Sequence, residues 1–246
     1  MSNIINRDDP TKLYMQLYEI MKQRIESGEW AVDSQIPIEQ DLCTIYDLSK
    51  ATVRQAVAEL ARQGYLKRLQ GKGTFVCKRI IPEGLSMVTS FRELMLDAGI
   101  KVTTKVLALT IMMPSEDLDI KLDIQDDRHI IYLKRLRLVD NEPVLLQETF
   151  IPHHICPSLL DDDLENNSLH ELLEKKYGLR FTKVQDYISL SCPPPNDCKA
   201  LALKEDCSVL LLEQLVFSGD TQLKYTRSYK RPDRFKFFIE LERQSL

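Results

Sequence analysis

The sequence lacks long apolar runs, paired cysteine motifs and an excess of positive charge. No apolar stretch approaches the roughly 20 residues of a transmembrane helix, and residues 1–10 carry acids without the apolar core of a signal peptide. We therefore expect a cytoplasmic protein. The six cysteines form no C-x-x-C pair and no histidine–cysteine cluster with zinc spacing, which predicts reduced, mostly buried thiols and neither a metal nor a cofactor.

The adjacent histidines His153 and His154 are a tempting metal pair because histidine is a common metal ligand. Adjacent residues on a strand, however, point to opposite faces and are poorly placed to share one ion. We therefore predict no metal site at this pair.

Charge is unevenly distributed along the 246 residues, although the total is only −4. Residues 50–80 contain eight lysines and arginines and one acid, a local charge of +7, which leaves −11 for the remainder. A basic patch on an acidic chain is typical of a localised nucleic-acid contact, and a solvated helix face is the plainer alternative. The length accommodates one large domain or two smaller ones.

The basic stretch has the pattern of a helix followed by a hairpin. Ser49 is placed to cap the helix and Gly64 to end it. Apolar residues recur at helical spacing and predict a buried stripe, at Val53, Ala56, Val57 and Leu60. The first exposed turns carry residue types that contact phosphates and base edges in the major groove, namely Lys50, Thr52, Arg54 and Gln55.

A tight, glycine-containing turn follows this helix and connects strands expected at 65–69 and 74–77. The turn residues are Gln70, Gly71, Lys72 and Gly73. Two further helices are expected at 10–27 and 37–46, with Ile36, Leu42 and Ile45 directed inward. Three helices and a basic hairpin form a winged helix-turn-helix domain, which we place at residues 1–78.

The rest of the chain has a different pattern. Residues 79–86 include Pro82 and Gly84 and break the periodicity, which predicts a linker that moves. In 87–246, strands joined by short turns are interspersed with short helices, so we predict an α+β domain with helices packed on an antiparallel sheet. Strands are expected at 102–113, 129–139, 143–151, 184–191, 208–217, 223–230 and 235–241, and helices at 114–121, 168–178 and 195–203.

The chain resembles one known family along nearly its whole length. Residues 13–76, with TVRQA in the helix and GKGTFV in the hairpin, are similar to the DNA-binding head of the GntR family of bacterial transcription regulators. SFRELM, YLKRLRLVDNEPV, LHELLEKKYGL and YTRSYKRPDRFKF resemble the UTRA effector domain of its HutC subfamily. The resemblance implies a chorismate-lyase-like fold for 87–246, a homodimer and an inverted-repeat DNA operator.

In the head, the resemblance places the four exposed helix residues in the major groove, with Arg54 contacting guanine, and the wing tip at Gly71 in the minor groove. Ile38 and Gln40 depart from the family, which usually has serine and often arginine there. That departure puts a phosphate contact and a base contact in question.

In the effector domain, the resemblance implies a site for a small anionic effector. Family members that bind phosphorylated sugars hold the phosphate at positions occupied here by Thr89, Ser90, Arg135, Arg137, Ser168 and His170, and we include the adjoining Phe91 and Arg92 in the predicted effector site. Arg135 and Arg137 are two residues apart and therefore share one sheet face, and a helix start at Ser168 attracts anions. The alternative is that both arginines are solvated and that Ser168 is only a cap.

The far side of the implied pocket also departs from the family. Gln147 and Lys224 stand where glutamates are common, which makes the pocket more cationic. The change favours a different phosphorylated sugar or acidic metabolite over an N-acetylated amino sugar phosphate. Tyr225, Arg227 and Tyr229 complete the predicted contacts, with cross-strand pairing in the sheet as the alternative for Arg227 and Tyr229.

Together these features predict an effector-controlled DNA-binding regulator, which we interpret as a repressor, and not an enzyme. A chorismate-lyase-like enzyme is one alternative because of the implied fold, but the sequence contains no organised acid–base constellation. A DNA-binding protein that responds to no effector is the other.

Overall fold

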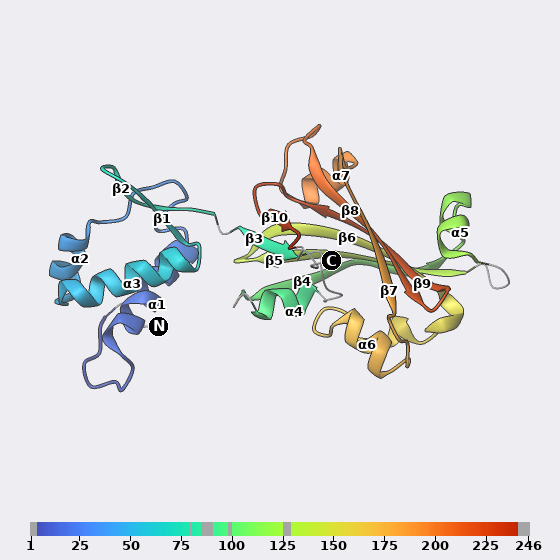
Figure 1. Cartoon of the computed structure of the whole chain (residues 1–246), viewed down its shortest axis with the longest axis horizontal. Coiled ribbons are helices and arrows are strands. Elements are labelled where there is room, and N and C mark those ends of the chain that lie inside the picture. The colour runs from blue at the N-terminus through green and yellow to red at the C-terminus, as the bar shows by residue number, and fades with distance from the viewer. Residues whose placement is uncertain (1–3, 79, 85–90, 98–99, 125–128, 241–246) are drawn as a thin grey trace, which may run out of the picture. The chain divides into compact units, whose positions relative to one another are not determined.

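The computed structural model of the chain describes residues 4–78, 80–84, 91–97, 100–124 and 129–240 (Figure 1). The chain divides into two compact units, Met1–Ile81 and Pro82–Leu246. Each unit encloses apolar clusters of its own, so each has the core that an independent domain requires.

The first unit consists of helices and one small hairpin. Its elements are α1 (Leu13–Glu26), α2 (Glu39–Tyr46), α3 (Lys50–Arg62), β1 (Leu66–Leu69) and β2 (Gly73–Val76), with β1 and β2 antiparallel. The apolar stripe predicted on α3 is buried throughout. The Ser49 hydroxyl accepts a hydrogen bond from the Thr52 amide, and Gly64 has a φ of +80°, so α3 begins and ends as predicted.

One of the inward-facing predictions in this unit is wrong. Ile36 and Leu42 are buried, but Ile45 is 57% exposed. Leu42 and Tyr46, one turn apart, form the buried face of α2. Ile45 is rotated by about 100° from Tyr46 around the helix, and this rotation directs it to solvent.

The segment expected to be a linker contains an unpredicted strand. β3 (Ile81–Gly84) pairs with β10 (Phe235–Phe238) in a two-stranded sheet. Pro82 fits because an edge strand needs hydrogen bonds on one side only. A Cβ on Gly84 would lie 3.1 Å from the Phe238 ring, so the two strands approach closely there.

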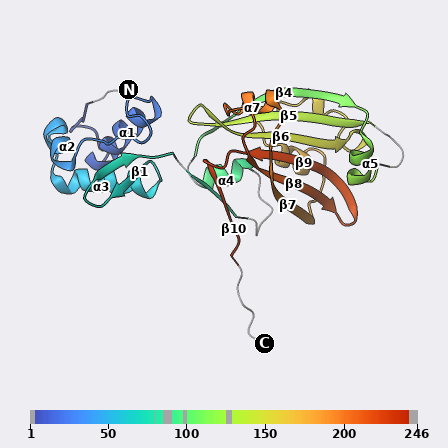
Figure 2. The ribbon, with the colours of Figure 1, turned by 90° about the horizontal axis from the view of Figure 1, so that it is seen from above.

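The second unit is built on a six-stranded antiparallel sheet with the order β4-β5-β6-β9-β8-β7 (Figure 2). Its strands are β4 (Val102–Met112), β5 (Ile130–Val139), β6 (Glu142–Pro152), β7 (Lys183–Ser191), β8 (Val209–Ser218) and β9 (Thr221–Lys230). Its helices are α4 (Phe91–Asp97), α5 (Glu116–Leu122), α6 (Leu169–Lys175), α7 (Pro195–Ala200) and the 3-10 helices η1 (His153–Ile155) and η2 (Leu159–Asp161). This is the predicted α+β architecture, although α4 was not anticipated.

Different helices cover the two faces of the sheet. On one face, Lys134 of β5 pairs with Asp197 of α7 at 2.6 Å, and Lys121 of α5 lies 3.1 Å from the Tyr225 hydroxyl. On the other face, apolar residues of β5 pack against α6. Because neighbouring strand residues alternate between faces, residues next to Lys134 in sequence point toward α6.

Three further predictions concern the histidine pair, the cysteines and membrane-spanning helices. The histidine pair lies in η1 and not on a strand, and the described residues contain no cluster of three potential metal ligands. The six cysteines are free thiols, but only Cys156 and Cys198 are buried and Cys192 is exposed, so the expectation of mostly buried thiols is wrong. Of the helices in the described ranges, none has the length and apolar character to cross a membrane.

Candidate functional site

The predicted base-contacting residues lie on the first turns of α3. Lys50, Arg54 and Gln55 are exposed, whereas Thr52 is half-buried with its hydroxyl 2.8 Å from that of Ser49. Thr52 therefore takes part in capping α3. The other three side chains form an exposed polar edge, which fits a helix that enters the major groove.

Glu39, at the start of α2, connects the helix and the hairpin. One of its carboxylate oxygens lies 3.4 Å from Arg54 Nε on α3, and the other lies 3.2 Å from Arg68 Nη2 on β1. A single carboxylate thus orients a cation from each element. No local sequence pattern indicates Glu39, because its partners are 15 and 29 residues away. Exposed ion pairs contribute about 1 kcal/mol or less, so Glu39 can release both arginines to DNA.

The two positions that depart from the family flank Glu39. Ile38 is 55% exposed and Gln40 is exposed. Ile38 occupies the N-cap of α2 without a side-chain hydrogen bond. An isoleucine cannot donate a hydrogen bond to a phosphate, which agrees with the phosphate contact questioned from the sequence.

The turn of the wing depends on its two glycines. Gly71 has a φ of +72° and Gly73 a φ of +125°, both in the region that favours glycine. A Cβ on Gly73 would also come within 2.3 Å of the Gln35 side chain. Gln70 and Lys72 are exposed, so the tip presents an amide and an ammonium group.

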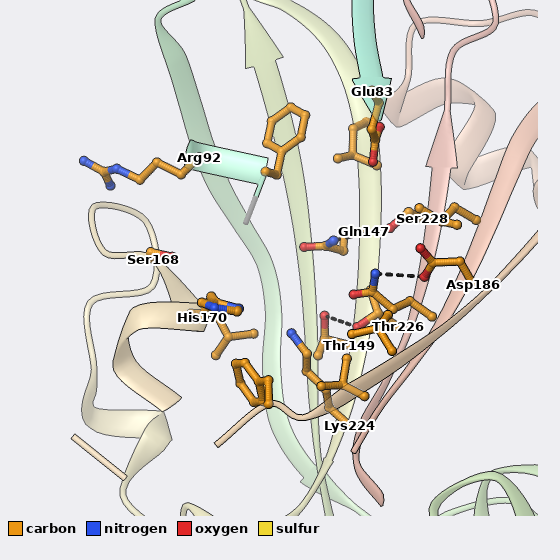
Figure 3. A pocket seen from close by; sticks show the side chains of 18 of the residues that line it. Glu83, Arg92, Gln147, Thr149, Ser168, His170, Asp186, Lys224, Thr226 and Ser228 are labelled. Atoms are coloured by element: carbon orange, nitrogen blue, oxygen red, sulfur yellow. Dashed lines mark hydrogen bonds between the residues drawn. The ribbon is translucent and has the colours of Figure 1, made fainter. Parts of the chain in front are cut away.

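A cavity of about 360 Å³ opens in the second unit, on the sheet face that α6 covers (Figure 3). The strand register places Arg135 opposite Gln147, and Gln147 opposite Ser228. Predicted effector-site residues that line the cavity are Phe91, Arg92, Arg135, Arg137, Gln147, Ser168, His170 and Lys224. Thr89 and Ser90 fall outside the described residues.

Arg135 is a buried cation with few partners. It is 3% exposed, and its Nη2 donates to Gln147 Oε1 at 2.9 Å. Its Nε and Nη1 are buried and have no hydrogen-bond partner in the described part of the chain. Burial, and then the charge of Arg137, lower the pKa of Arg135 well below its usual value. Because an unpaired buried polar group costs about 1–3 kcal/mol, the site favours binding of an anion.

Gln147 holds Arg135 without neutralising it. Its Oε1 accepts from Arg135, and its Nε2 donates to the Ser228 hydroxyl at 3.3 Å. A carboxylate at this position would pair with Arg135 and cancel its charge. The glutamine therefore leaves the arginine charge available to a ligand.

Arg137 is also buried, at 8% exposure, and it donates to the Thr104 hydroxyl. Its guanidinium lies 5.7 Å from the centroid of the Phe91 ring. Burial, and then the charge of Arg92, lower its pKa to about 10. The alternative that Arg135 and Arg137 are solvated is therefore wrong. Arg92 itself is exposed, donates to the Asn166 carbonyl and points away from the cavity centre (Figure 3).

Lys224 and His170 lie together at the other end of the cavity (Figure 3). Lys224 is 9% exposed, and burial followed by the charge of Arg135 lowers its pKa to about 8, against an opposing effect of Glu174. His170 packs on the Phe181 ring at 4.6 Å, with Nε2 3.5 Å from a Glu174 oxygen. Burial, and then Lys224, lower the His170 pKa, so this imidazole is neutral at pH 7.

Ser168 caps α6 at the edge of the cavity. Its hydroxyl accepts from the Glu171 amide at 3.4 Å. The Glu171 carboxylate accepts from Lys175 at 2.8 Å and makes no reciprocal bond to the cap within the described residues, so only one half of a capping box is formed.

Three predicted contacts, Tyr225, Arg227 and Tyr229, do not line the cavity. They alternate with Lys224 along β9 and therefore point to the opposite face of the sheet. Arg227 Nη2 lies 3.1 Å from a Glu148 oxygen of β6, so the cross-strand alternative holds for this arginine. Tyr225 hydrogen-bonds a carboxylate of β8, and Tyr229 packs in an apolar cluster with residues of β5 and β6.

The sequence analysis missed other residues on the cavity side of β9. Thr226, Ser228 and Lys230 line the cavity with Lys224, and the two-residue period applied to Lys224 would have found them. Lys230 pairs with Glu83, which arrives from β3 and which no local pattern could place there.

The lining of the cavity is predominantly cationic. Six of the lining residues are lysines or arginines, whereas two, Glu83 and Asp186, are acids. Asp186 lies on β7, and its carboxylate accepts from Gln214 Nε2 at 2.9 Å. Burial raises the pKa of Asp186, which weakens its contribution of negative charge as the pH falls. The excess of cations indicates a site for an anionic ligand.

Comparison with known families decides the assignment. A profile described as "Bacterial regulatory proteins, gntR family" matches residues 13–76, and the UTRA domain matches residues 97–236. The chain belongs to the GntR family of bacterial transcription regulators. As a GntR-family member it is a DNA-binding regulator and not an enzyme, and regulators of this family bind DNA operators and small-molecule effectors.

GntR-family relatives match over nearly their full length. The chain is 33% identical to the uncharacterized HTH-type transcriptional regulator YurK of Bacillus subtilis, covering 90% of this chain and 92% of YurK. It is 26% identical to the transcriptional repressor NagR of the same organism, covering 98% and 99%. The crystal structure of PhnF from Mycobacterium smegmatis shares the fold, with a TM-score of 0.70, 24% identity and coverage of 91% and 98%.

Proposed function

We propose that this GntR-family regulator is a homodimeric repressor that leaves its operator when a phosphorylated sugar or a related acidic metabolite occupies the cavity. The observation that carries the proposal is Arg135, a buried guanidinium in a cation-rich cavity, with two nitrogens that have no partner among the described residues. A buried charge of this kind is costly without a counter-ion. In a regulator that binds no effector this buried charge would only destabilise the fold, and this disfavours the effector-independent alternative.

The names of several relatives support a role in sugar metabolism. NagR of Bacillus subtilis is a transcriptional repressor, and MngR of Escherichia coli is a mannosyl-D-glycerate transport/metabolism system repressor. A further Escherichia coli relative is described as a probable fructoselysine utilization operon transcriptional repressor. These relatives favour repression over activation and a sugar-derived effector over other anions.

The homodimer is supported by an exposed edge of the sheet. β7 ends the strand order and exposes three large side chains, Tyr187 at 56%, Ile188 at 44% and Leu190 at 72%. An apolar edge strand is a surface on which a second copy can pack. Two heads related by a two-fold axis would bind an inverted repeat.

Selection of the full-length protein on a random DNA library, followed by fluorescence anisotropy with the selected duplex, tests this function. We expect an inverted repeat, and we expect a binding phosphorylated sugar to raise the Kd for DNA by about 5- to 150-fold, the usual range of allosteric coupling. Absence of any enriched sequence would refute operator recognition. DNA affinity that is unchanged while a sugar phosphate binds would refute effector control.

Binding of an effector that places an anionic group beside Lys224 should weaken above pH 8. The folded-state pKa of Lys224 is about 8, below the usual 10.5, so the ammonium loses its charge between these values. Arg135 and Glu174 also face Lys224, and the pKa of His170 is lowered, so this imidazole is already neutral in this window. Affinity should fall by up to about ten-fold per pH unit above 8, as one lost proton requires. Calorimetry at pH 7, 8, 9 and 10 measures this slope, and a flat profile would contradict it.

The same shift has the opposite consequence for stability. Below pH 8 the lysine is charged in both states and the folded state is destabilised by its burial. Between pH 8 and about 10.5 the unfolded chain binds more protons than the folded one, so the ligand-free protein gains stability as the pH rises. Lys224→Met should remove this gain in thermal unfolding.

A further inference from the structure

The cationic side chains of the cavity differ in how many hydrogen-bond or ion-pair partners they already have. Lys230 is paired with Glu83, and Arg137 donates to Thr104. Arg135 is held by Gln147 through one of its nitrogens. The side chain of Lys224 has neither a hydrogen bond nor an ion pair with any described residue, and its Nζ lies 5.3 Å from the Phe181 ring centroid. Of these four side chains, Lys224 is the one with no polar partner.

Lys224 is also separated from Arg137, although the charge of Arg135 reaches it. Lys224 and Lys230 are six residues apart on β9, which corresponds to about 20 Å of strand. Arg135 and Arg137 lie opposite the end that contains Ser228 and Lys230, because the register pairs Arg135 with Gln147 and Gln147 with Ser228. A phosphate bound at Arg137 is therefore too far away to neutralise Lys224.

The surroundings of Lys224 supply further groups that suit an anion. Thr149 and Thr226, whose hydroxyls lie 3.4 Å apart, line the cavity beside it, and His170 faces it from α6 (Figure 3). The acid whose charge raises the pKa of Lys224 is Glu174, whose side chain is 43% exposed and lies 3.5 Å from His170. Hydroxyls and an ammonium together can hold a carboxylate or a phosphate.

We propose that Lys224, with Thr149 and Thr226, forms a second anion site, so that the effector is a phosphorylated sugar with another anionic group at its far end. The inference rests on the proposed function and specifies the effector of the same cavity. The second group is a carboxylate or a second phosphate. A carboxylate and a phosphate both present oxygen acceptors to an ammonium, and matched pairs of ligands distinguish between these two groups.

Calorimetry on the full-length protein with two ligand pairs tests the second site. Fructose 6-phosphate and fructose 1,6-bisphosphate differ by one phosphate, and sorbitol 6-phosphate and 6-phosphogluconate differ by one carboxylate. We expect at least one of the ligands with a second anionic group to bind about ten-fold or more tightly than its matched monophosphate, as a charge-assisted hydrogen bond in a buried site allows. Lys224→Met should abolish this preference while the monophosphate binds as before.

A matched control is Lys175→Gln, because Lys175 is 75% exposed on α6 and does not line the cavity. Thermal unfolding establishes that Lys224→Met is folded, and Lys224→Gln provides a second variant without the charge. If Lys224→Met loses the same affinity for both ligands of a matched pair, a single phosphate lies between Lys224 and Arg135. That result would overturn the second site. Equal affinities of the wild type for both members of each pair would overturn it as well. If none of the four probes binds, the sugar-phosphate effector fails and the second site fails with it.

Discussion

Replacement of Arg135 by methionine is expected to abolish the response to the effector while operator binding survives. A sugar phosphate should lose affinity by about 30-fold or more, because removing one partner of a buried charged pair costs about 2–5 kcal/mol. The ligand-free variant should at the same time melt at a higher temperature, since methionine removes a buried charge whose Nε and Nη1 lack partners among the described residues. Calorimetry and thermal unfolding measure the two effects.

Arg227→Met is the matched control for Arg135→Met. Arg227 lies on the opposite face of the same sheet, where it pairs with Glu148, so its loss should leave effector affinity unchanged. It should lower rather than raise the melting temperature, because it breaks an existing ion pair. Retained effector affinity in Arg135→Met would remove this arginine from the site.

Replacement of Arg54 by alanine should weaken operator binding by about 5- to 150-fold, which corresponds to the 1–3 kcal/mol of a good contact to a base. Arg54 is exposed on α3, and its only ion pair in the described residues is with Glu39 at 3.4 Å. The loss should be much smaller on random DNA, because the contact reads sequence. Competition titrations of the operator against random duplex measure both values.

Lys72→Ala and Arg62→Ala serve as comparisons for Arg54→Ala. Lys72 is at the exposed tip of the wing, so its loss should weaken specific and random DNA alike and reduce the salt dependence of binding. Arg62 ends α3 and pairs with Glu59, so it should have little effect on either DNA. Equal losses on operator and random DNA for Arg54→Ala would refute its base-reading role.

The head was predictable because its signals are local. The Ser49 cap, the buried stripe of α3 and the glycine turn are set by residues within a few positions of one another. Ile45 was placed wrongly because a short helix allows more than one buried face, and tertiary packing selected Leu42 and Tyr46. Glu39 was missed because its contacts depend on how α2, α3 and β1 pack.

The effector site was predictable only in part. The paired arginines, Gln147 and Lys224 were placed by resemblance, and the structure brings them into one cavity. Tyr225, Arg227 and Tyr229 were assigned to the cavity wrongly. They alternate with Lys224 along β9, so they cannot share its face of the sheet. Glu83 could not be found, because it reaches Lys230 across 147 residues of sequence through a strand that no pattern indicated.

The short connection before β3 limits how far the DNA-binding head can travel. The wing ends at Val76 and β3 begins at Ile81, so the intervening tether has a contour length of about 18 Å. Its far end is fixed in part by Glu83, which is bound to Lys230 in the cavity. An anion that captures Lys230 would loosen this anchor and enlarge the volume that the head samples. In a dimer, a larger volume lowers the effective concentration of the second head at its half-site, and operator affinity falls without any change in the protein–DNA contacts themselves.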